Sequence, residues 1–390
     1  MKAIVVGAGI GGLAAALALL RRDWTVEVLE RAPELTEVGA GIQVSPNGMK
    51  ALTALGLAET VEARSYEPQA LEMRIGRSGR RLFRLKQGQR MRARYGAPYL
   101  QVHRADLLAI LSQAVSAAGG AIRTSVEVED YMGAAAISGG ETVAKGDLLI
   151  GADGLRSAIR AAMLEPAPPR FTGVVAWRAL APAEALSAFD MPAGACAWVG
   201  DGRHCVTYPL RGGDLVNFVG LVERNEPEGE SWTIEGDRED ALADFAGWAT
   251  PLRTILETAE TVHRWPLYDR PPLRRWTEGP VALLGDACHP MLPSFAQGAC
   301  MALEDAWRLG VEVGDGSGDI PTALKRYELA RRDRATQVQQ GARANMNRFH
   351  KRDWLTATFG FLPIWAAGRV APWLIENHTA WVYGYDETAA

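Results

Sequence analysis

A glycine-rich turn between a short apolar strand and an Ala/Leu-rich helix limits most strongly what this chain can fold into. Gly7, Gly9 and Gly12 follow a strand expected over 2–6 and precede a helix expected over 13–21. A second strand, over 24–29, ends at Glu30, eighteen positions after Gly12. A strand–helix–strand unit of this kind requires a parallel sheet with a right-handed crossover. The glycines allow close approach to a pyrophosphate and Glu30 can accept ribose hydroxyls, so the pattern predicts a dinucleotide site rather than a packing turn alone.

Two later strand ends carry the same combination of glycine and acid. An apolar strand over 147–150 leads into Gly151-Ala152-Asp153-Gly154, and another over 280–284 leads into Gly285-Asp286, followed by Gln297-Gly298-Ala299. The first motif alone does not separate FAD from NAD. Three such strand ends are more than NAD requires, whereas the ADP, ribityl and flavin parts of FAD each need an anchor. The sequence therefore favours FAD.

The pattern along the 390 residues predicts more than one domain. Short alternating segments over 71–94 and 170–223 indicate antiparallel strands, with a clear hairpin of 204–210, the turn 211–214 and 215–222. From Met301 onward the chain is expected to be helical, with an exposed arginine-rich helix over 326–343. The predicted fold class is α/β (α+β overall), with three parts: a discontinuous Rossmann-like FAD-binding domain (1–70, 98–165 and 279–320), an inserted antiparallel-sheet substrate domain (71–97 and 166–278) and a helical C-terminal region (321–390).

Composition narrows the classes of partner. A net charge of −4 gives no reason to expect nucleic acid. The four cysteines form no C-x-x-C pair and no zinc-like grouping with the six histidines, which predicts reduced thiols, no metal and a cytoplasmic protein. Only Met1 and Lys2 stand before the apolar part of the first strand, so no signal peptide is expected. The apolar stretch 354–374 is interrupted by glycine, proline and arginine, which favours packed helices over a membrane span.

The three motifs, in this order, are similar to those of the flavoprotein monooxygenase family that includes 4-hydroxybenzoate and salicylate hydroxylases. The likeness extends over essentially the whole chain. Within the family, the chain most resembles the 6-hydroxynicotinate 3-monooxygenases. The stretches that carry this likeness are 39–42, Pro46-Asn47, 99–104, 285–291, 296–301, 304–306 and 381–386.

The resemblance implies an enzyme that uses FAD, O2 and NADH or NADPH as a transient co-substrate. It would hydroxylate a small aromatic or heteroaromatic acid, such as a hydroxynicotinate, salicylate or hydroxybenzoate, through a flavin C4a-hydroperoxide, with or without decarboxylation. A monomer or homodimer without integral membrane association is expected. The alternatives are a halogenase or reductase of the same fold and a flavoprotein that binds FAD without turnover.

The resemblance also assigns cofactor contacts to matching positions. Glu30 and Arg31 would bind the adenosine part, and Asp153 would lie near the pyrophosphate. Gly298 and Ala299, at a helix start, would face the isoalloxazine, because a helix N-terminus favours the anionic reduced flavin. The full expected set is Gly7, Gly9, Gly12, Glu30, Arg31, Gln43, Arg104, Val126, Asp153, Asp286, Gly298 and Ala299.

His204 and Tyr208 are the expected catalytic residues. Electrophilic hydroxylation works best on a ring that has lost a proton, so the protein must supply a base or proton relay and exclude water. Four positions apart on one strand, the two side chains share a face, roughly 13 Å apart at ~3.3 Å per residue. A lone strand histidine is more often structural, but both positions match catalytic residues of the family.

Three further residues are weaker candidates for the substrate pocket: Gln43, Cys196 and Pro293. Gln43 replaces a histidine of the 6-hydroxynicotinate enzymes, and a glutamine cannot act as a base near neutral pH. For Cys196, a small buried hydrophobic role is an equal alternative. His289, after Asp286, is expected to be structural.

Overall fold

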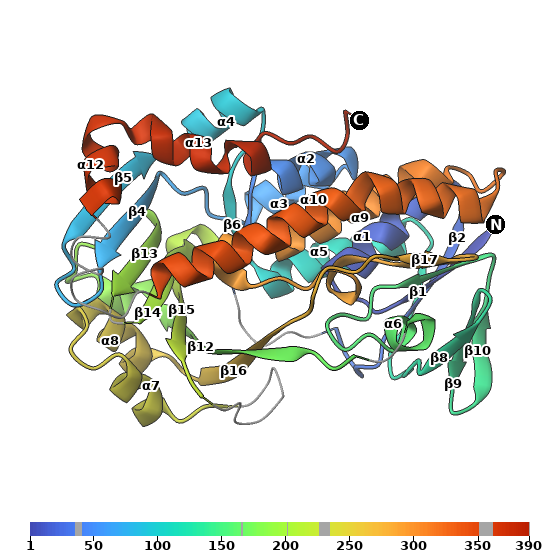
Figure 1. The fold of residues 1–390 in the computed structure, drawn as a ribbon, viewed down its shortest axis with the longest axis horizontal. Helices are drawn as coiled ribbons and strands as arrows, with labels where there is room; N and C mark the ends of the chain where they lie inside the picture. The colour runs from blue at the N-terminus through green and yellow to red at the C-terminus, as the bar shows by residue number, and fades with distance from the viewer. Residues whose placement is uncertain (36–40, 165–166, 201, 226–234, 351–361, 390) are drawn as a thin grey trace.

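Two large β-sheets organise the chain, and the long helix α10 (Ile320–Phe349) runs past both of them (Figure 1). The computed structural model describes residues 1–35, 41–164, 167–200, 202–225, 235–350 and 362–389. Helix α10 packs on α9 (Gly298–Val313), near the first sheet, and its C-terminal half reaches the face of the second sheet. The two sheets are therefore held to one framework by a single helix.

The first sheet collects strands from distant parts of the chain. Its order is β17-β18-β11-β1-β2-β7, and all neighbours are parallel except β17 and β18. The carboxyl ends of β1, β11 and β18 therefore meet at one edge, as the three strand-end motifs predict. The strands are β1 (Lys2–Val6), β2 (Thr25–Leu29), β7 (Ala121–Arg123), β11 (Leu148–Gly151), β17 (Thr277–Glu278) and β18 (Val281–Leu283).

The second sheet has seven strands in the order β16-β12-β15-β14-β13-β4-β5. Its neighbours are antiparallel except for β13 and β4. The predicted hairpin is confirmed: His204 pairs with Leu221, and Tyr208 pairs with Asn217. The strands are β4 (Ala70–Ile75), β5 (Arg81–Lys86), β12 (Arg170–Pro182), β13 (Gly194–Gly200), β14 (Arg203–Leu210), β15 (Leu215–Glu223) and β16 (Val262–Asp269).

The remaining described elements cover these sheets. Two small sheets are formed by β3 (Gly41–Val44) with β6 (Leu100–His103), and by β8 (Asp130–Met132), β9 (Ala135–Ser138) and β10 (Glu141–Lys145). The other α-helices are α1 (Ile10–Leu20), α2 (Pro46–Ala54), α3 (Ala58–Ala63), α4 (Gln89–Tyr95), α5 (Arg104–Ala117), α6 (Ala158–Met163), α7 (Arg238–Asp244), α8 (Thr250–Thr258), α12 (Leu362–Val370) and α13 (Pro372–Tyr383). Short 3-10 turns lie at Ala183–Leu186, Arg211–Gly213, Gly285–Ala287 and Pro293–Phe295.

The sequence-based expectations differ from the structure in two places. The end of the segment 71–94 is helix α4 rather than strand: the helix is bounded by Gly88 and Gly96, both with positive φ, and it buries Met91. The helix expected to be exposed over 326–343 buries Arg331 completely. Within the apolar stretch 354–374, residues 354–361 lie outside the described residues, as do residues 39–40 of the stretches that carry the family likeness. The rest of that apolar stretch forms helices.

Of the hydrophobic cores among the described residues, the two largest belong to different sheets. One core fills the parallel sheet and its helices, and the other lies between the seven-stranded sheet and α7 and α8. Much of the opposite face of the seven-stranded sheet is turned toward the strand ends of the parallel sheet. Among the described residues, no helix combines the length and apolar character that crossing a membrane would require.

Candidate functional site

A cavity of about 700 Å³ opens where the parallel strand ends meet the face of the seven-stranded sheet. One side is made by the loops after β1, β11 and β18 and by the start of α9. The opposite side is made by β4, β12, β13, β14, β15 and β16, and helix α13 adds a third wall. Its size suits a ligand site rather than a packing defect. Segments from the whole length of the chain therefore build one site.

The first glycine loop is shaped by very close backbone contacts. Gly7 has φ +102°, and a Cβ there would lie 2.4 Å from the Ala152 carbonyl oxygen. A Cβ on Gly12 would lie 2.0 Å from the Gly7 carbonyl oxygen. At Gly9 the situation is reversed: a Cβ would have nothing within 4 Å of it, and the residue lines the cavity. The loop is thus closed on its protein side and open on its cavity side, which is the shape an extended phosphate-bearing group needs.

The predicted acidic anchor, Glu30, lies beside this loop. Its carboxylate accepts hydrogen bonds from the backbone N–H groups of Ala8 at 2.8 Å and Ala32 at 2.9 Å. Val126 donates its N–H to the Glu30 carbonyl oxygen at 2.9 Å, and Arg31 is exposed at the same end. The residues assigned to the adenosine part are therefore gathered at one place, although Arg31, Val126 and Glu30 do not line the cavity itself.

We expect Gly9→Val to keep the fold and to weaken flavin binding by about tenfold or more. The valine would project into open space, so the apoprotein has nothing to rearrange, whereas an obstructing side chain costs a ligand about 1–3 kcal/mol. The ratio of flavin to protein absorbance and a reconstitution titration measure the loss. Gly318→Val is the matched control, because Gly318 also has nothing within 4 Å of an added Cβ. Full flavin occupancy in Gly9→Val would mean that the cofactor follows another path.

The second strand end is tied to the third by buried polar contacts. Asp153 accepts the Ile159 N–H at 3.2 Å at the start of α6, and burial raises its pKa. Its neighbours Ala152 and Gly154, rather than Asp153 itself, line the cavity. Arg160 donates to the Ala287 carbonyl oxygen at 2.7 Å, which joins this loop to the one after β18. Asp153 is therefore placed to shape the loop under a cofactor and not to touch it directly.

The third strand end places an acid and a helix N-terminus together. Asp286 lines the cavity, and burial raises its pKa although His289 and Arg104 lower it. Gly298 and Ala299 begin α9, whose N-cap residue makes no side-chain capping bond. The same is true of α1 at the first loop. Two uncapped helix N-termini, each with partial positive charge, thus face one cavity. These donors fit a pyrophosphate and an anionic flavin ring.

Both predicted catalytic residues lie on the cavity face of β14. His204 and Tyr208 line the cavity together with Val206, between them on the same face. Burial, and then the neighbouring His350, hold the pKa of His204 well below its usual range. Burial raises the pKa of Tyr208, although Arg178 and a hydrogen bond with Gln43 act in the opposite direction. At neutral pH the site therefore presents an uncharged imidazole, which is a base, and a protonated phenol, which is a donor.

Gln43 and Pro293 line the cavity, as expected, whereas Cys196 does not. Ala195 and Ala197 face the cavity, and Cys196 between them points to the other side of the sheet, into the core with Trp198 and Cys205. The pocket assignment of Cys196 is thus corrected, because strand side chains alternate. The role as a small buried hydrophobic residue is the one the packing supports.

Sequence reasoning missed several polar residues that line the cavity, among them Arg178, Tyr99 and Tyr383. Arg178, on β12, stacks on the ring of Trp265 at 4.4 Å and is close enough to affect Tyr208. Tyr99 donates to the Gln43 side-chain oxygen, and its ring meets Tyr383 edge-on at 5.7 Å. The alternation along β12 could have indicated an inward arginine, but which face is inward depends on strand pairing.

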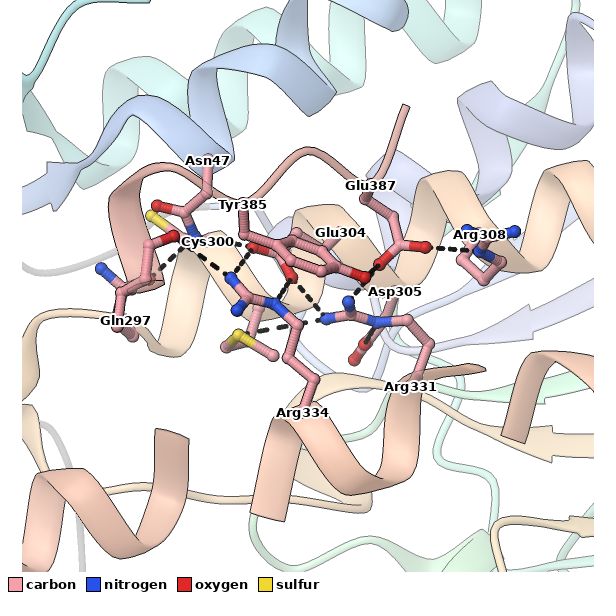
Figure 2. Close-up of polar contacts among 12 residues, drawn as sticks. Asn47, Gln297, Cys300, Glu304, Asp305, Arg308, Arg331, Arg334, Tyr385 and Glu387 are labelled. Atoms are coloured by element: carbon pink, nitrogen blue, oxygen red, sulfur yellow. Dashed lines mark hydrogen bonds and ion pairs between the residues drawn. The ribbon is translucent and has the colours of Figure 1, made fainter. Parts of the chain in front are cut away.

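A buried ion cluster around Arg331 includes two acidic residues of α9, Glu304 and Asp305 (Figure 2). Arg331 is fully buried and contacts Glu304 at 2.7 Å, Asp305 at 2.8 Å and Glu387. Arg334 contacts Glu304 at 2.7 Å, and Arg308 contacts Glu387, so three guanidinium groups face these carboxylates. Burial favours protonation of Asp305, but His289 and Arg331 outweigh it and lower its pKa to about 2.

Asn47 connects this cluster to Gln297, which lines the cavity. Its side-chain nitrogen donates to Glu304 at 2.7 Å and to Gln297 at 2.9 Å, and Gln297 is the N-cap residue of α9. Near the C-terminus, the ring of Tyr385 packs on the Arg334 guanidinium, and its hydroxyl donates a hydrogen bond to Glu387 (Figure 2). The C-terminal tail thus helps to hold the helix start that faces the cavity.

His289 has the structural role expected of it, in an ion pair with Asp305. The fold also gathers Cys288, His289 and Asp305, whose ligand-type atoms lie within 4.8 Å of one another, a grouping that sequence spacing did not show. One Asp305 oxygen already contacts His289 and the other contacts Arg331. The three residues act as part of the buried ion cluster.

Comparisons with known proteins agree with this geometry. The FAD binding domain family matches residues 1–342. The 3-amino-4-hydroxybenzoate 2-monooxygenase of Streptomyces cremeus is 37% identical over 98% of this chain and 95% of its own. The 6-hydroxynicotinate 3-monooxygenase of Pseudomonas fluorescens is 35% identical over 98% and 94%. The crystal structure of Klebsiella pneumoniae HpxO complexed with FAD and uric acid has a TM-score of 0.83 and 31% identity, and the likeness covers 97% of this chain and 95% of that one.

Proposed function

Because this chain belongs to the FAD binding domain family and is an FAD-dependent aromatic monooxygenase, we propose that it hydroxylates a small aromatic or heteroaromatic acid that already bears a hydroxyl group. The observation that carries the proposal is that the buried, uncharged His204 and the cationic Arg178 line the same wall of the cavity. A base suits the hydroxyl group of such a substrate, and a guanidinium suits its carboxylate.

The residues around the cavity fit FAD. The open side of Gly9, the N-terminus of α1 and the nearby Glu30 would hold its ADP part, and Asp286 would hold the ribityl chain. Gly298 and Ala299 would face the ring. When bound, FAD supplies the transfer of electrons from NADH or NADPH and the activation of O2. The protein supplies binding, orientation and proton handling.

We assign the proton handling to His204 and Tyr208. The imidazole of His204 would take the proton of the substrate hydroxyl, which makes the ring electron-rich enough for electrophilic hydroxylation. The neutral hydroxyl of Tyr208, positioned by Gln43, would donate a hydrogen bond to the substrate. Trp265 and Phe349 line the same space with apolar surface, which limits the access of water.

We assign the recognition of the substrate carboxylate to Arg178. Its guanidinium stacks on Trp265, which restricts the side chain to one orientation, and its positive charge reaches the hydroxyl of Tyr208. The carboxylate of Glu72 also lines the cavity, but it is held by Arg74 at 2.9 Å. An organic acid therefore meets a cation on the side of the cavity opposite the cofactor loops.

We expect Arg178→Met to raise the KM for the aromatic acid by about 10- to 100-fold, since a charge-assisted hydrogen bond contributes about 1.5–3 kcal/mol. A phenol analogue without the carboxylate should lose much less. Steady-state NAD(P)H oxidation with both compounds measures the difference. Arg264→Met is the matched control, because Arg264 stacks on Trp177 at 5.5 Å, outside the cavity. Equal losses for the acid and for its carboxylate-free analogue would reject this role of Arg178.

A substrate screen tests the proposed function. Hydroxybenzoates, hydroxynicotinates and related heterocycles are mixed with the holoenzyme, and stimulated NADH and NADPH oxidation is followed, with products identified by mass. We expect at least one acid to accelerate oxidation and to gain one oxygen atom. Lack of stimulation by every acid in the panel would contradict the proposal and favour a non-catalytic flavoprotein.

Several further expectations remain predictions. We propose the division into an FAD-binding part (1–70, 98–165 and 279–320), a substrate part (71–97 and 166–278) and a helical C-terminal part (321–390). We also propose a cytoplasmic monomer or homodimer. Light scattering of the purified holoenzyme would test the assembly state, and folding of separately expressed parts would test the division.

A further inference from the structure

A line of three titratable side chains leads away from the cavity behind His204. The Nδ1 atom of His204 lies 2.8 Å from Nε2 of His350, and Nδ1 of His350 lies 3.2 Å from Oε1 of Glu223. His204 is 1% exposed and His350 is 9% exposed, whereas the Glu223 side chain is 26% exposed. Hydrogen-bonding atoms therefore connect the cavity wall to solvent.

These residues come from three elements that the fold brings together. His204 is on β14, Glu223 ends β15, and His350 directly follows α10. His350 does not line the cavity, while its neighbour Phe349 does, and the Phe349 ring packs against His204 at 4.9 Å. The His204 ring thus contacts the rings of Phe349 and His350, and its Nδ1 atom lies against His350.

Hydrogen-bond donor and acceptor roles determine which ring nitrogen of each histidine carries a proton. An ionised carboxylate only accepts, so Nδ1 of His350 must donate to Glu223. When His350 is neutral, its Nε2 is an acceptor, and Nδ1 of His204 then carries the proton between the two rings. Nε2 of His204 is left with a lone pair, and it is the ring nitrogen available to a ligand in the cavity. The line therefore selects the tautomer in which His204 can act as a base.

We propose that His350 and Glu223 form a proton relay that takes the hydroxyl proton of the substrate from His204 to solvent and returns it to the product. This inference rests on the proposed function and deepens it. His350 and Glu223 are positioning residues, because they act through His204 and do not touch the substrate.

The transfer balances without any co-reactant. The substrate O–H bond breaks as its proton binds Nε2 of His204, while the Nδ1 proton of His204 moves to Nε2 of His350. The Nδ1 proton of His350 moves to the Glu223 carboxylate, which releases it to water. The substrate is left as its anion, and the sum of charges is unchanged. Transfer in the reverse direction protonates the product and restores both histidine tautomers.

The test follows proton release in the oxidised holoenzyme, so it needs no turnover. The probe is 3-hydroxy-4-nitrobenzoate, a phenolic acid whose anion is coloured, at a pH where the free probe is mostly protonated. Stopped-flow absorbance follows formation of the bound anion, and a pH indicator in weak buffer follows the proton that reaches solvent. The wild type is expected to form the anion and release the proton together.

In His350→Gln and Glu223→Gln we expect the rates of anion formation and of proton release to fall by about tenfold or more. Interrupting the relay removes part of the general-base effect of His204, which is about 10²–10⁴ in rate. Probe affinity should stay within about twofold. Imidazole added to His350→Ala should restore part of the rate. His263→Gln and Glu260→Gln are matched controls outside the line and should behave as wild type. Flavin content confirms that each variant is folded.

Each contrary result has a distinct meaning. Wild-type rates in His350→Gln would overturn the relay and leave the proposed function intact. A loss of affinity with unchanged rates, without rescue by imidazole, would assign His350 to packing and also overturn it. A wild type that binds the probe without ionising it would reject both the relay and the base role of His204. Failure of the proposed function itself appears separately, in the substrate screen.

Discussion

His204→Ala is expected to retain FAD and lose hydroxylation by a factor of about 10² or more, because removal of a positioned base typically costs about 10²–10⁴ in rate. The imidazole belongs to β14, on the side of the cavity opposite the loops after β1, β11 and β18, and its Nδ1 atom lies against His350. Tyr208→Phe should show a smaller loss, since it removes one hydrogen bond and keeps the ring that packs beside Leu210. Hydroxylated product formed per NAD(P)H consumed measures both effects.

The control for this pair is His263→Ala, a histidine of β16 that does not line the cavity. It should retain wild-type rates and coupling. Substrate-stimulated flavin reduction should also survive in His204→Ala, because the residue handles the substrate proton and not the electrons from the nicotinamide. Full coupled activity in both His204→Ala and Tyr208→Phe would remove the assignment of this wall of the cavity.

Arg331→Met is expected to be the most destabilising of these single changes, at about 3–5 kcal/mol. Its guanidinium is completely buried and faces Glu304, Asp305 and Glu387. Without this guanidinium the carboxylates would be left with uncompensated charge in a low-dielectric interior, which lowers the free energy of unfolding by about 3–5 kcal/mol. Thermal and urea unfolding of the holoenzyme measure the change. Flavin retention should also fall, since Glu304 supports the N-cap of α9 through Asn47.

Arg326→Met is the matched control on the same helix. Arg326 pairs with Glu312 at 2.8 Å, but its side chain is 55% exposed. An exposed pair of this kind contributes about 0–1 kcal/mol, so the stability of this variant should be nearly unchanged. Similar unfolding curves for Arg331→Met and Arg326→Met would mean that the buried cluster contributes little more than an ordinary surface pair.

The cofactor side of the site could be predicted from the sequence because its signals are local. Gly7 and Gly12 make backbone contacts that an added side chain would block, Gly9 leaves the cavity side open, and the strand and helix around them can be predicted from periodicity. The acids Asp153 and Asp286 follow apolar strands in the same way. Parallel strands place their carboxyl ends at one edge, so three separate motifs could be assigned to one site.

The substrate side was only partly predictable. The alternation along β14 put His204 and Tyr208 on one face correctly, but it could not say where Cys196 points, because that depends on the register between β13 and β14. Cys196 pairs with Thr207, and the pairing turns both away from the cavity. The inward direction of Arg178 depends in the same way on its partners in β15 and β16.

Short sequence patterns were enough to indicate the nucleotide fold and FAD, since the backbone geometry of each pattern is set by neighbouring residues, whereas the type of chemistry followed from the resemblance to the flavoprotein monooxygenases. The meeting of distant side chains is visible only in the folded chain: Arg331 with Glu387, and His204 with His350 and Glu223. These contacts join positions separated by 56 to 146 residues. Their partners are chosen by sheet register and helix packing, which no local pattern records.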